Sequence, residues 1–298
     1  MCVQRMCQAF RTTPVRPGGS VTVSAMADAP EAERIPDGDR QQSLQSLERG
    51  MAVIQVFSRQ RPALTLSEVA NLTGITRATA RRILLTLEKL GHVRSDGRLF
   101  SPTPRLLTLG WAYLSSLNLS ELALPLMETL VEDTHESCSA ATLDLPDVVY
   151  VARVPTRRIM SITLSVGTRL PAHCTSMGRV LLAALAPDEL DRYLAGAALE
   201  AWTERTTTDP DRLRAALDET RQRGWALVDQ ELEIGLRSVA APIRRGPDTI
   251  AALNVSSAVS RVSLDDLRRR ILPPLVQTAT TISNALTQQG PSYQRTVS

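Results

Sequence analysis

The chain has 298 residues, with 34 Lys and Arg against 31 Asp and Glu, 43% hydrophobic residues and four cysteines. At about 100–200 residues per domain, this length predicts two domains. The composition excludes an intrinsically disordered chain and a disulfide-rich miniprotein.

Neither a membrane segment nor a metal site is indicated by the sequence. No uninterrupted apolar run approaches the roughly 20 residues that a membrane helix requires, and the first residues lack the apolar core of a signal peptide. We therefore expect a cytoplasmic protein with no membrane partner. The cysteines and the three histidines show no metal-ligand spacing, so we expect neither a metal nor a cofactor.

Charge is unevenly distributed along the chain. Residues 43–118 contain ten basic and four acidic residues, whereas residues 119–298 contain 19 basic and 22 acidic residues. This asymmetry indicates that the first domain binds a polyanion. Residues 1–41 are rich in Pro, Gly, Ser, Asp and Ala without apolar periodicity, which predicts a disordered leader or a start of translation at Met26.

The first helix is predicted from Ser43 onward. Its apolar residues recur on one stripe until Arg61-Pro62 ends the helix. The stripe consists of Leu47, Met51, Ile54 and Phe57.

Two further helices are predicted in the segment LTLSEVANLTGITRATARRILLTLEKLG. Ser67 or Thr65 is expected to cap the first of them and Thr76 the second, with a tight turn at Thr73-Gly74-Ile75 between them. The second helix is expected to bury an apolar face and to expose a polar one near its start. The buried set is Ala80, Ile83, Leu84, Leu87 and Leu90, and the exposed set is Arg77, Thr79, Arg81 and Arg82.

A hairpin is predicted after Gly91, with strands at 92–95 and 98–101 around Asp96-Gly97. Three helices followed by a hairpin predict a winged helix-turn-helix, whose recognition helix enters the major groove of double-stranded DNA. The candidate DNA contacts are Thr76, Arg77, Thr79, Arg81, Arg82 and Arg98. The alternative is an ordinary three-helix domain with a solvated basic face.

A linker helix is predicted at 104–118, after the DNA-binding domain at 42–103. Its Leu106, Leu109, Trp111, Tyr113 and Leu117 form an apolar surface that we expect to pack against a second copy of the chain. The second domain is predicted at 119–290, followed by a tail at 291–298.

The second domain is predicted to have an α+β fold with an antiparallel sheet, because its strands meet mostly through hairpins. Helices are expected at 121–135, 176–186, 187–195, 211–224 and 264–287. Strands are expected at 138–143, 148–154, 160–164, 225–228, 237–243 and 250–255.

Over roughly residues 43–288, the sequence resembles the IclR family of bacterial transcriptional regulators. The stretches that carry the resemblance are LTLSEVANLTGITRATARRILLTLEKLGHV, RLPAHCTSMGRVLLAAL, GWALVDQELEIGLRSVAAPI and AALNVSS. The resemblance implies a winged helix-turn-helix, a linker helix and a GAF-like effector-binding domain. It also implies a homodimer or tetramer that binds a palindromic operator.

One branch of that family is especially similar, namely the regulators of protocatechuate, 4-hydroxybenzoate and β-ketoadipate catabolism. The stretches in common include DGRLFSPTPRLLTLGWAYLSSL and VYVARVPTRRIMSITLSVGTRLPAHCTSMGRVLLA. This similarity implies a small carboxylated effector from aromatic catabolism. An IclR-type regulator of another catabolic pathway is the alternative.

Two segments are candidates for effector binding. Thr175 is expected to cap a helix whose first N–H groups, those of Ser176, Met177 and Gly178, bind a carboxylate. The alternative is that Thr175 and water satisfy these donors. The family resemblance places Asp229 and Ser238 in the same site. Further cations lie at Arg153, Arg157 and Arg158, although an exposed hairpin face would explain them equally well.

Two other classes of function fit the sequence less well. A hydrolase would need a nucleophile and a base, for which Ser176, Cys174 and His173 are adjacent in sequence but lack a nucleophile elbow or a distant base. Glu231 and Glu233 resemble a carboxylate pair without a cleft signature. A purely architectural DNA-binding protein would not need the acidic second domain. We therefore expect a regulator that is not an enzyme.

Overall fold

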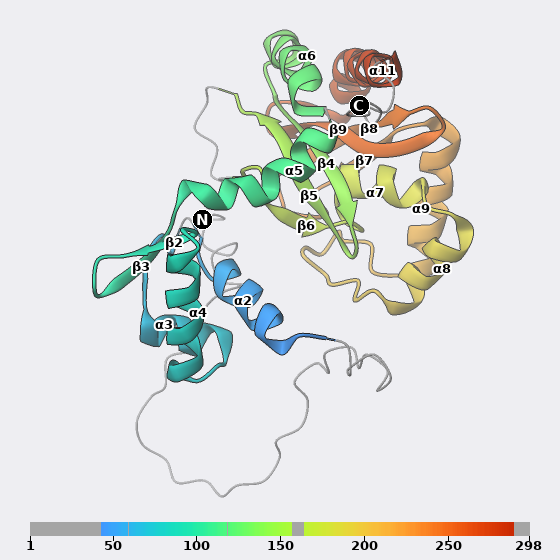
Figure 1. The fold of residues 1–298 in the computed structure, drawn as a ribbon. Helices are drawn as coiled ribbons and strands as arrows, with labels where there is room; N and C mark the ends of the chain where they lie inside the picture. The colour runs from blue at the N-terminus through green and yellow to red at the C-terminus, as the bar shows by residue number, and fades with distance from the viewer. Residues whose placement is uncertain (1–42, 59, 118, 157–163, 289–298) are drawn as a thin grey trace, which may run out of the picture. The chain divides into compact units, whose positions relative to one another are not determined.

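The computed structural model describes residues 43–58, 60–117, 119–156 and 164–288. The chain divides between Tyr113 and Leu114 into two compact units, whose helices and strands are labelled in Figure 1. The predicted leader at 1–41 and the tail at 291–298 lie outside the described residues. Within the described ranges, no helix is both long and apolar enough to span a membrane.

The first unit is a winged helix-turn-helix, as predicted. Its strands form a small antiparallel sheet in the order β1-β3-β2. The elements are α2 (Gln45–Gln55), β1 (Leu64–Thr65), α3 (Leu66–Thr73), α4 (Arg77–Lys89), β2 (Val93–Ser95) and β3 (Leu99–Pro102). The pairing of β1 with β3 was not predicted, because two residues are too few for a strand pattern.

Local capping explains where α3 begins and ends. Thr65, and not Ser67, is the N-cap: the Glu68 N–H donates to Thr65 Oγ1 (3.3 Å), and the Thr65 N–H donates to Glu68 Oε2 (2.8 Å). Gly74 ends the helix at a φ of 67°, a left-handed conformation that glycine adopts without a Cβ clash. The predicted turn therefore lies between the last residue of α3, Thr73, and the N-cap of α4, Thr76.

The tip of the wing differs from the prediction. β2 ends at Ser95 and β3 begins at Leu99, so the loop spans residues 96–98 rather than only Asp96-Gly97. The cause is the Asp96 carboxylate, whose Oδ1 accepts hydrogen bonds from the N–H groups of Arg98 (2.9 Å) and Leu99 (2.7 Å). These bonds keep Arg98 in the turn, so that β3 begins one residue later than predicted.

Several residues predicted to lie in the core of this unit are exposed. Val53, absent from the predicted stripe, is the fully buried residue of α2, whereas Leu47 and Met51 are exposed. Leu90 is exposed too, because it is the C-cap of α4 and lies beyond the turn that packs on the core.

The predicted linker helix begins with a 3-10 turn at Pro104–Leu106 and continues as α5 (Leu107–Leu117). Leu107, Leu109, Trp111 and Tyr113 are all exposed. The side chain of Leu117 lies outside the described part. Residues two apart do not share a side of an α-helix, so Leu107 and Trp111 form one exposed apolar side of α5, and Leu109 and Tyr113 form another. Apolar helix surfaces exposed in a single chain are typical of a protein contact.

The second unit has the predicted α+β fold. Its antiparallel sheet has the strand order β6-β5-β4-β9-β8-β7. The strands are β4 (Ser137–Asp144), β5 (Asp147–Val154), β6 (Arg169–Pro171), β7 (Ala226–Asp229), β8 (Leu236–Arg245) and β9 (Asp248–Ala258). The helices are α6 (Leu119–Thr134), α7 (Ser176–Ala183), α8 (Pro187–Gly196), α9 (Pro210–Arg223), α10 (Leu264–Asp266) and α11 (Leu272–Gln288).

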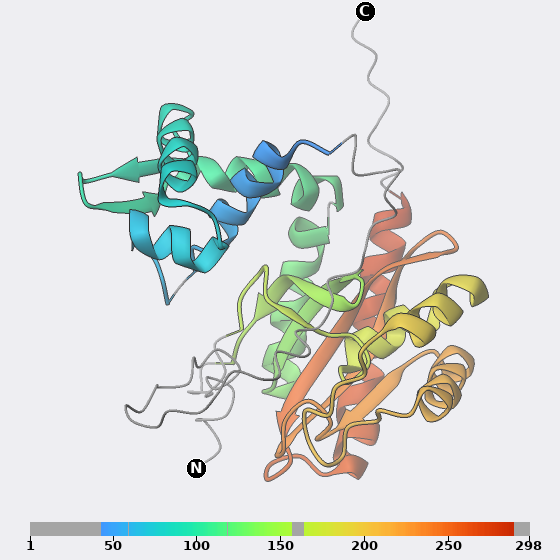
Figure 2. The same cartoon turned by 90° about the horizontal axis from the view of Figure 1, so that it is seen from below.

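Helices cover both faces of this sheet (Figures 1 and 2). Side chains alternate between the faces along each strand. On β8 and β9, Val239 and Leu253 pack with α6 and α11, whereas Ala240 and Ala252 pack with α7, α8 and α9. The alanines leave room for α7 to lie close to the sheet, and we call this side the α7 face.

One predicted strand in this unit is not tested, and one predicted helix needs correction. The strand predicted at 160–164 lies outside the described residues except for Leu164. The strand β6 at Arg169–Pro171 is not among the predicted strands. The last helix is interrupted by a π-helical turn at Leu267–Ile271. Pro273 and Pro274, which have no N–H group, follow that turn and account for its altered hydrogen bonding.

Candidate functional site

The recognition helix α4 presents a basic face. Ala80, Leu84 and Leu87 are buried against α2, α3 and the wing, which turns Arg77, Arg81 and Arg82 outward. Arg77 and Arg81 are four residues apart and therefore share one face. Within the described residues, no carboxylate or carbonyl engages these three guanidinium groups, so they are available to phosphates and guanines.

The other predicted DNA contacts have different surroundings. Thr76 caps α4 by accepting the Thr79 N–H (3.2 Å), and the two threonine hydroxyls bond to each other (2.9 Å). Arg98 is exposed on the wing. Hydrogen bonds from the N–H groups of Leu99 and Arg98 lower the pKa of Asp96, the neighbouring carboxyl.

The start of α7 is buried and incompletely hydrogen-bonded. Thr175 accepts the Gly178 N–H (3.1 Å), so that donor is not available to a ligand, contrary to the prediction. The N–H groups of Ser176 and Met177 have no partner in the described chain. Ser176 is 1% exposed as a whole residue, and its hydroxyl also lacks a partner there. A buried polar group without a partner is costly, which favours a bound polar ligand at this point.

Gly178 fixes how closely α7 approaches the preceding segment. A Cβ atom added at Gly178 would lie 2.1 Å from the carbonyl oxygen of Ala172 and 2.4 Å from its Cα. The close approach of these two backbones requires glycine at this position.

The strand register places the remaining predicted effector residues. Ser238 pairs with Ser256 on β9 and shares the α7 face with Ala240. Asp229 pairs with Arg237, one residue along, and so lies on the opposite face. Its carboxylate accepts a hydrogen bond from Arg237 Nε (3.0 Å) and forms an ion pair with Arg205 Nη1 (3.6 Å). Asp229 is therefore separated from Ser176 and Ser238.

A buried ion pair ties α7 to the loop after β7. Arg179 Nη2 lies 2.6 Å from Glu231 Oε2, and both side chains are at most 10% exposed. Glu231 also accepts the Thr207 N–H (2.9 Å), and Arg179 donates through Nε to the His173 carbonyl (3.0 Å). Since Arg179 lies in the first turns of α7, this network holds the start of the helix in place.

Comparison with known families decides the class of the protein. Residues 46–97 match the IclR helix-turn-helix domain, and residues 111–284 match the C-terminal domain of the bacterial transcriptional regulator IclR. The chain belongs to the IclR family. It is a DNA-binding transcriptional regulator and not an enzyme, and the resemblance seen in the sequence is confirmed.

Relatives of this IclR-family chain include regulators of aromatic catabolism. It is 46% identical over 267 residues to the Pca regulon regulatory protein of Pseudomonas putida, covering 88% of this chain and 91% of that one. It is 36% identical to the p-hydroxybenzoate hydroxylase transcriptional activator of Acinetobacter baylyi, covering 80% and 90%. An IclR homologue of Microbacterium hydrocarbonoxydans complexed with 4-hydroxybenzoate has a TM-score of 0.74 at 26% identity, covering 82% and 99%.

The groups weighed for hydrolysis in this IclR-family chain do not form a catalytic arrangement. His173 Nε2 bonds to the Glu200 carbonyl (3.0 Å), and burial raises the pKa of the Cys174 thiol to about 12. Glu231 is used by Arg179. Across the described ranges, no three His, Cys, Asp or Glu residues are grouped as a metal site would require.

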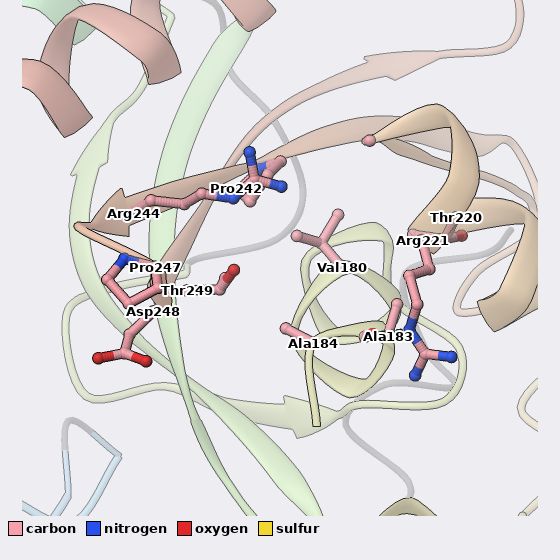
Figure 3. A pocket seen from close by; sticks show the side chains of 11 residues that line it. Val180, Ala183, Ala184, Thr220, Arg221, Pro242, Arg244, Pro247, Asp248 and Thr249 are labelled. Carbon is pink, nitrogen blue, oxygen red and sulfur yellow. Dashed lines mark hydrogen bonds between the residues drawn. The ribbon is translucent and has the colours of Figure 1, made fainter. Parts of the chain in front are cut away.

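A cavity of about 390 Å³ lies away from the predicted effector residues. It is bounded by the C-terminal half of α7, the end of α9 and the β8–β9 hairpin (Figure 3). Arg244 and Asp248 line it from the hairpin, and Arg221 lines it from α9, where it donates to the Ala183 carbonyl (2.8 Å). Neither Ser176 nor Ser238 reaches this cavity.

Sequence reasoning missed most of the polar residues on the α7 face. Asn254 lies on β9, Ser139 lies on β4, and both are buried. In the sequence Arg153 is only one of several candidate cations, whereas the structure pairs it with Ser139. The signal available in the sequence is the alternation of the polar residues Asn254 and Ser256 directly after the apolar run at 250–253.

Proposed function

We propose that this regulator binds a palindromic operator as a homodimer or tetramer and responds to a small carboxylated metabolite of aromatic catabolism. The observation that carries the proposal is the incompletely bonded start of α7, on the same face of the sheet as Ser238. The similarity to regulators of aromatic catabolism, and to a homologue complexed with 4-hydroxybenzoate, supports the choice of pathway. DNA binding would place the protein in the bacterial cytoplasm.

The arginines of α4 carry the DNA-binding part of the proposal. We expect the double variant Arg77→Ala/Arg81→Ala to lose about 1–3 kcal/mol of operator binding per lost base contact, with its fold intact. Fluorescence anisotropy with operator DNA at several salt concentrations measures the loss. Arg192→Ala/Arg212→Ala, which removes the same charge from exposed positions in the second unit, is the control. Wild-type affinity in the first variant would contradict the assignment.

The exposed apolar residues on two sides of α5 support the oligomer. Leu107, Leu109, Trp111 and Tyr113 are exposed in the single chain, and a second copy would bury them. Sedimentation at micromolar concentration is expected to give a dimer or larger species. A monomer at that concentration would rule out this interface.

The effector is proposed to place its carboxylate against the N–H groups of Ser176 and Met177, near Ser238. Charge-assisted hydrogen bonds of roughly 1.5–3 kcal/mol each offset the loss of water from the carboxylate. The apolar body of the ligand would then lie on the alanines of the sheet. Binding to one conformation better than another would shift DNA affinity, because the two equilibria are linked.

The test begins with a thermal-shift screen of aromatic acids and their ring-cleavage products. For each acid that binds, calorimetry compares the free acid with its methyl ester. We expect the ester to bind at least tenfold more weakly, because it lacks the charge. Equal affinity would show that the carboxylate is not held at α7.

Ser238→Leu provides the second arm of the test. The larger side chain would fill the α7 face beside Ser256 and is expected to abolish effector binding while leaving DNA binding intact. Ser260→Leu, the same change at an exposed turn, is the matched control. If Ser238→Leu titrates like the wild type, the effector lies elsewhere.

A further inference from the structure

An arginine lies among small polar side chains on the α7 face. Ser139 on β4 pairs with Arg153 on β5 and with Asn254 on β9, so these three side chains form one row across the sheet. The next row contains Ser256 and Ser238. Because paired residues of antiparallel strands point to the same face, all five side chains share the face that carries α7.

The charge of Arg153 is not neutralised within the described residues. Its Nη1 donates to Ser139 Oγ (3.2 Å), and no carboxylate in the described ranges pairs with it. The groups that act on it electrostatically are the Tyr150 hydroxyl and the Cys138 thiol, and burial lowers the pKa of Arg153. Residues 157–163, which follow in the sequence, include two arginines and no acidic residue. A partly buried cation without a counterion favours a bound anion.

Asn254 provides a second polar group that the protein does not fully use. The residue is buried, at 4% exposed. One end of its amide bonds to Ser256 Oγ (2.9 Å), and the other end, Oδ1, has no partner in the described chain. Buried amides are normally bonded at both ends, so a ligand group beside Asn254 would satisfy it.

The Arg153 row and the start of α7 belong to one continuous surface. Met177, in the first turn of α7, packs in the same core cluster as Ala240, Ala252 and Ala141. Ala240 pairs with Asn254 in the Arg153 row, and Ala252 and Ala141 form the adjoining row. Rows on one face are about 6.5–7 Å apart along a strand. A short molecule could therefore contact the α7 start and the Arg153 row together.

We propose that Arg153 binds a second carboxylate of the effector, so that the site selects short dicarboxylic acids over monocarboxylic acids of the same length. This inference rests on the proposed function, in which the first carboxylate lies at Ser176 and Met177. Ring-opened products of aromatic acids belong to the dicarboxylate class, whereas hydroxybenzoates carry one carboxylate. Arg153 is thus a specificity-determining residue of the effector site.

The test is calorimetry on the full chain with adipate and hexanoate, which have the same carbon chain and differ by one carboxylate. We expect the wild type to bind adipate at least tenfold more tightly than hexanoate. Arg153→Gln, which retains a donor for Ser139, is expected to remove that preference and to leave hexanoate affinity within about twofold. Arg244→Gln removes the same charge from the cavity in Figure 3 and is expected to retain the preference. Unchanged thermal unfolding of Arg153→Gln is the check on its fold.

The outcomes separate this inference from the proposed function. Equal binding of adipate and hexanoate by the wild type, or no binding of adipate, would overturn it. A preference for adipate that survives in Arg153→Gln would also overturn it. In either case, hexanoate or an aromatic monocarboxylate that binds the wild type but not Ser238→Leu would leave the proposed function standing. If no carboxylate of any class binds, both fail.

Discussion

Replacing Gly178 with alanine is expected to destabilise the second unit by roughly 3 kcal/mol and to abolish effector binding. The added Cβ would lie 2.1 Å from Ala172 O and 2.5 Å from Ala172 C, well inside any non-bonded contact. These are backbone atoms, so no side-chain rotation can relieve the overlap. The start of α7 would have to move away from the Ala172 segment, carrying the Ser176 and Met177 N–H groups with it.

Urea unfolding monitored by circular dichroism measures the loss of stability, and calorimetry with the acid found in the screen measures binding. Gly196→Ala is the matched control, because Gly196 also lies in a helix of this unit and a Cβ there has nothing within 4 Å. That variant is expected to be as stable as the wild type or slightly more so. A Gly178→Ala protein within about 1 kcal/mol of wild type would show that the segment yields easily.

Much of the DNA-binding unit was predictable because its signals are local. The Thr65 and Thr76 caps, the glycine at position 74 and the apolar spacing of Ala80, Leu84 and Leu87 each determine a boundary or a face within a few residues. The wing register was not predictable to the residue. The segment could form a two-residue turn at Asp96-Gly97 or a longer turn held by the Asp96 carboxylate. The hydrogen bonds from the Arg98 and Leu99 N–H groups to that carboxylate favour the longer turn.

The effector site depends on pairings between distant segments, which one sequence does not reveal. Ser139 and Asn254 are more than one hundred residues apart in the chain, and only the β4–β9 register brings them together. Asp229 shows that closeness in sequence does not ensure closeness in the fold. Asp229 on β7 and Ser238 on β8 lie on paired strands, yet the alternation of side chains places them on opposite faces of the sheet.

Glu231→Gln is expected to destabilise the second unit by about 3–5 kcal/mol, because it leaves the Arg179 charge buried without a counterion. Glutamine retains an acceptor for Thr207 N–H, so the loss reports mainly the missing charge. Asp188→Asn is the control, since it removes the exposed pair with Arg192 and is expected to cause no measurable change.

The pair also anchors the start of α7, so the consequence should extend to effector binding. Replacing both partners, as Arg179→Met/Glu231→Leu, removes the uncompensated charge and is expected to recover most of the stability that Glu231→Gln loses. Effector affinity is not expected to recover with it, because Arg179 Nε also holds the His173 carbonyl next to the helix start. Urea unfolding and calorimetry on the wild type, Glu231→Gln and Arg179→Met/Glu231→Leu separate the effect on stability from the effect on effector binding. If Glu231→Gln is as stable as Asp188→Asn, the ion pair does not hold α7 in place.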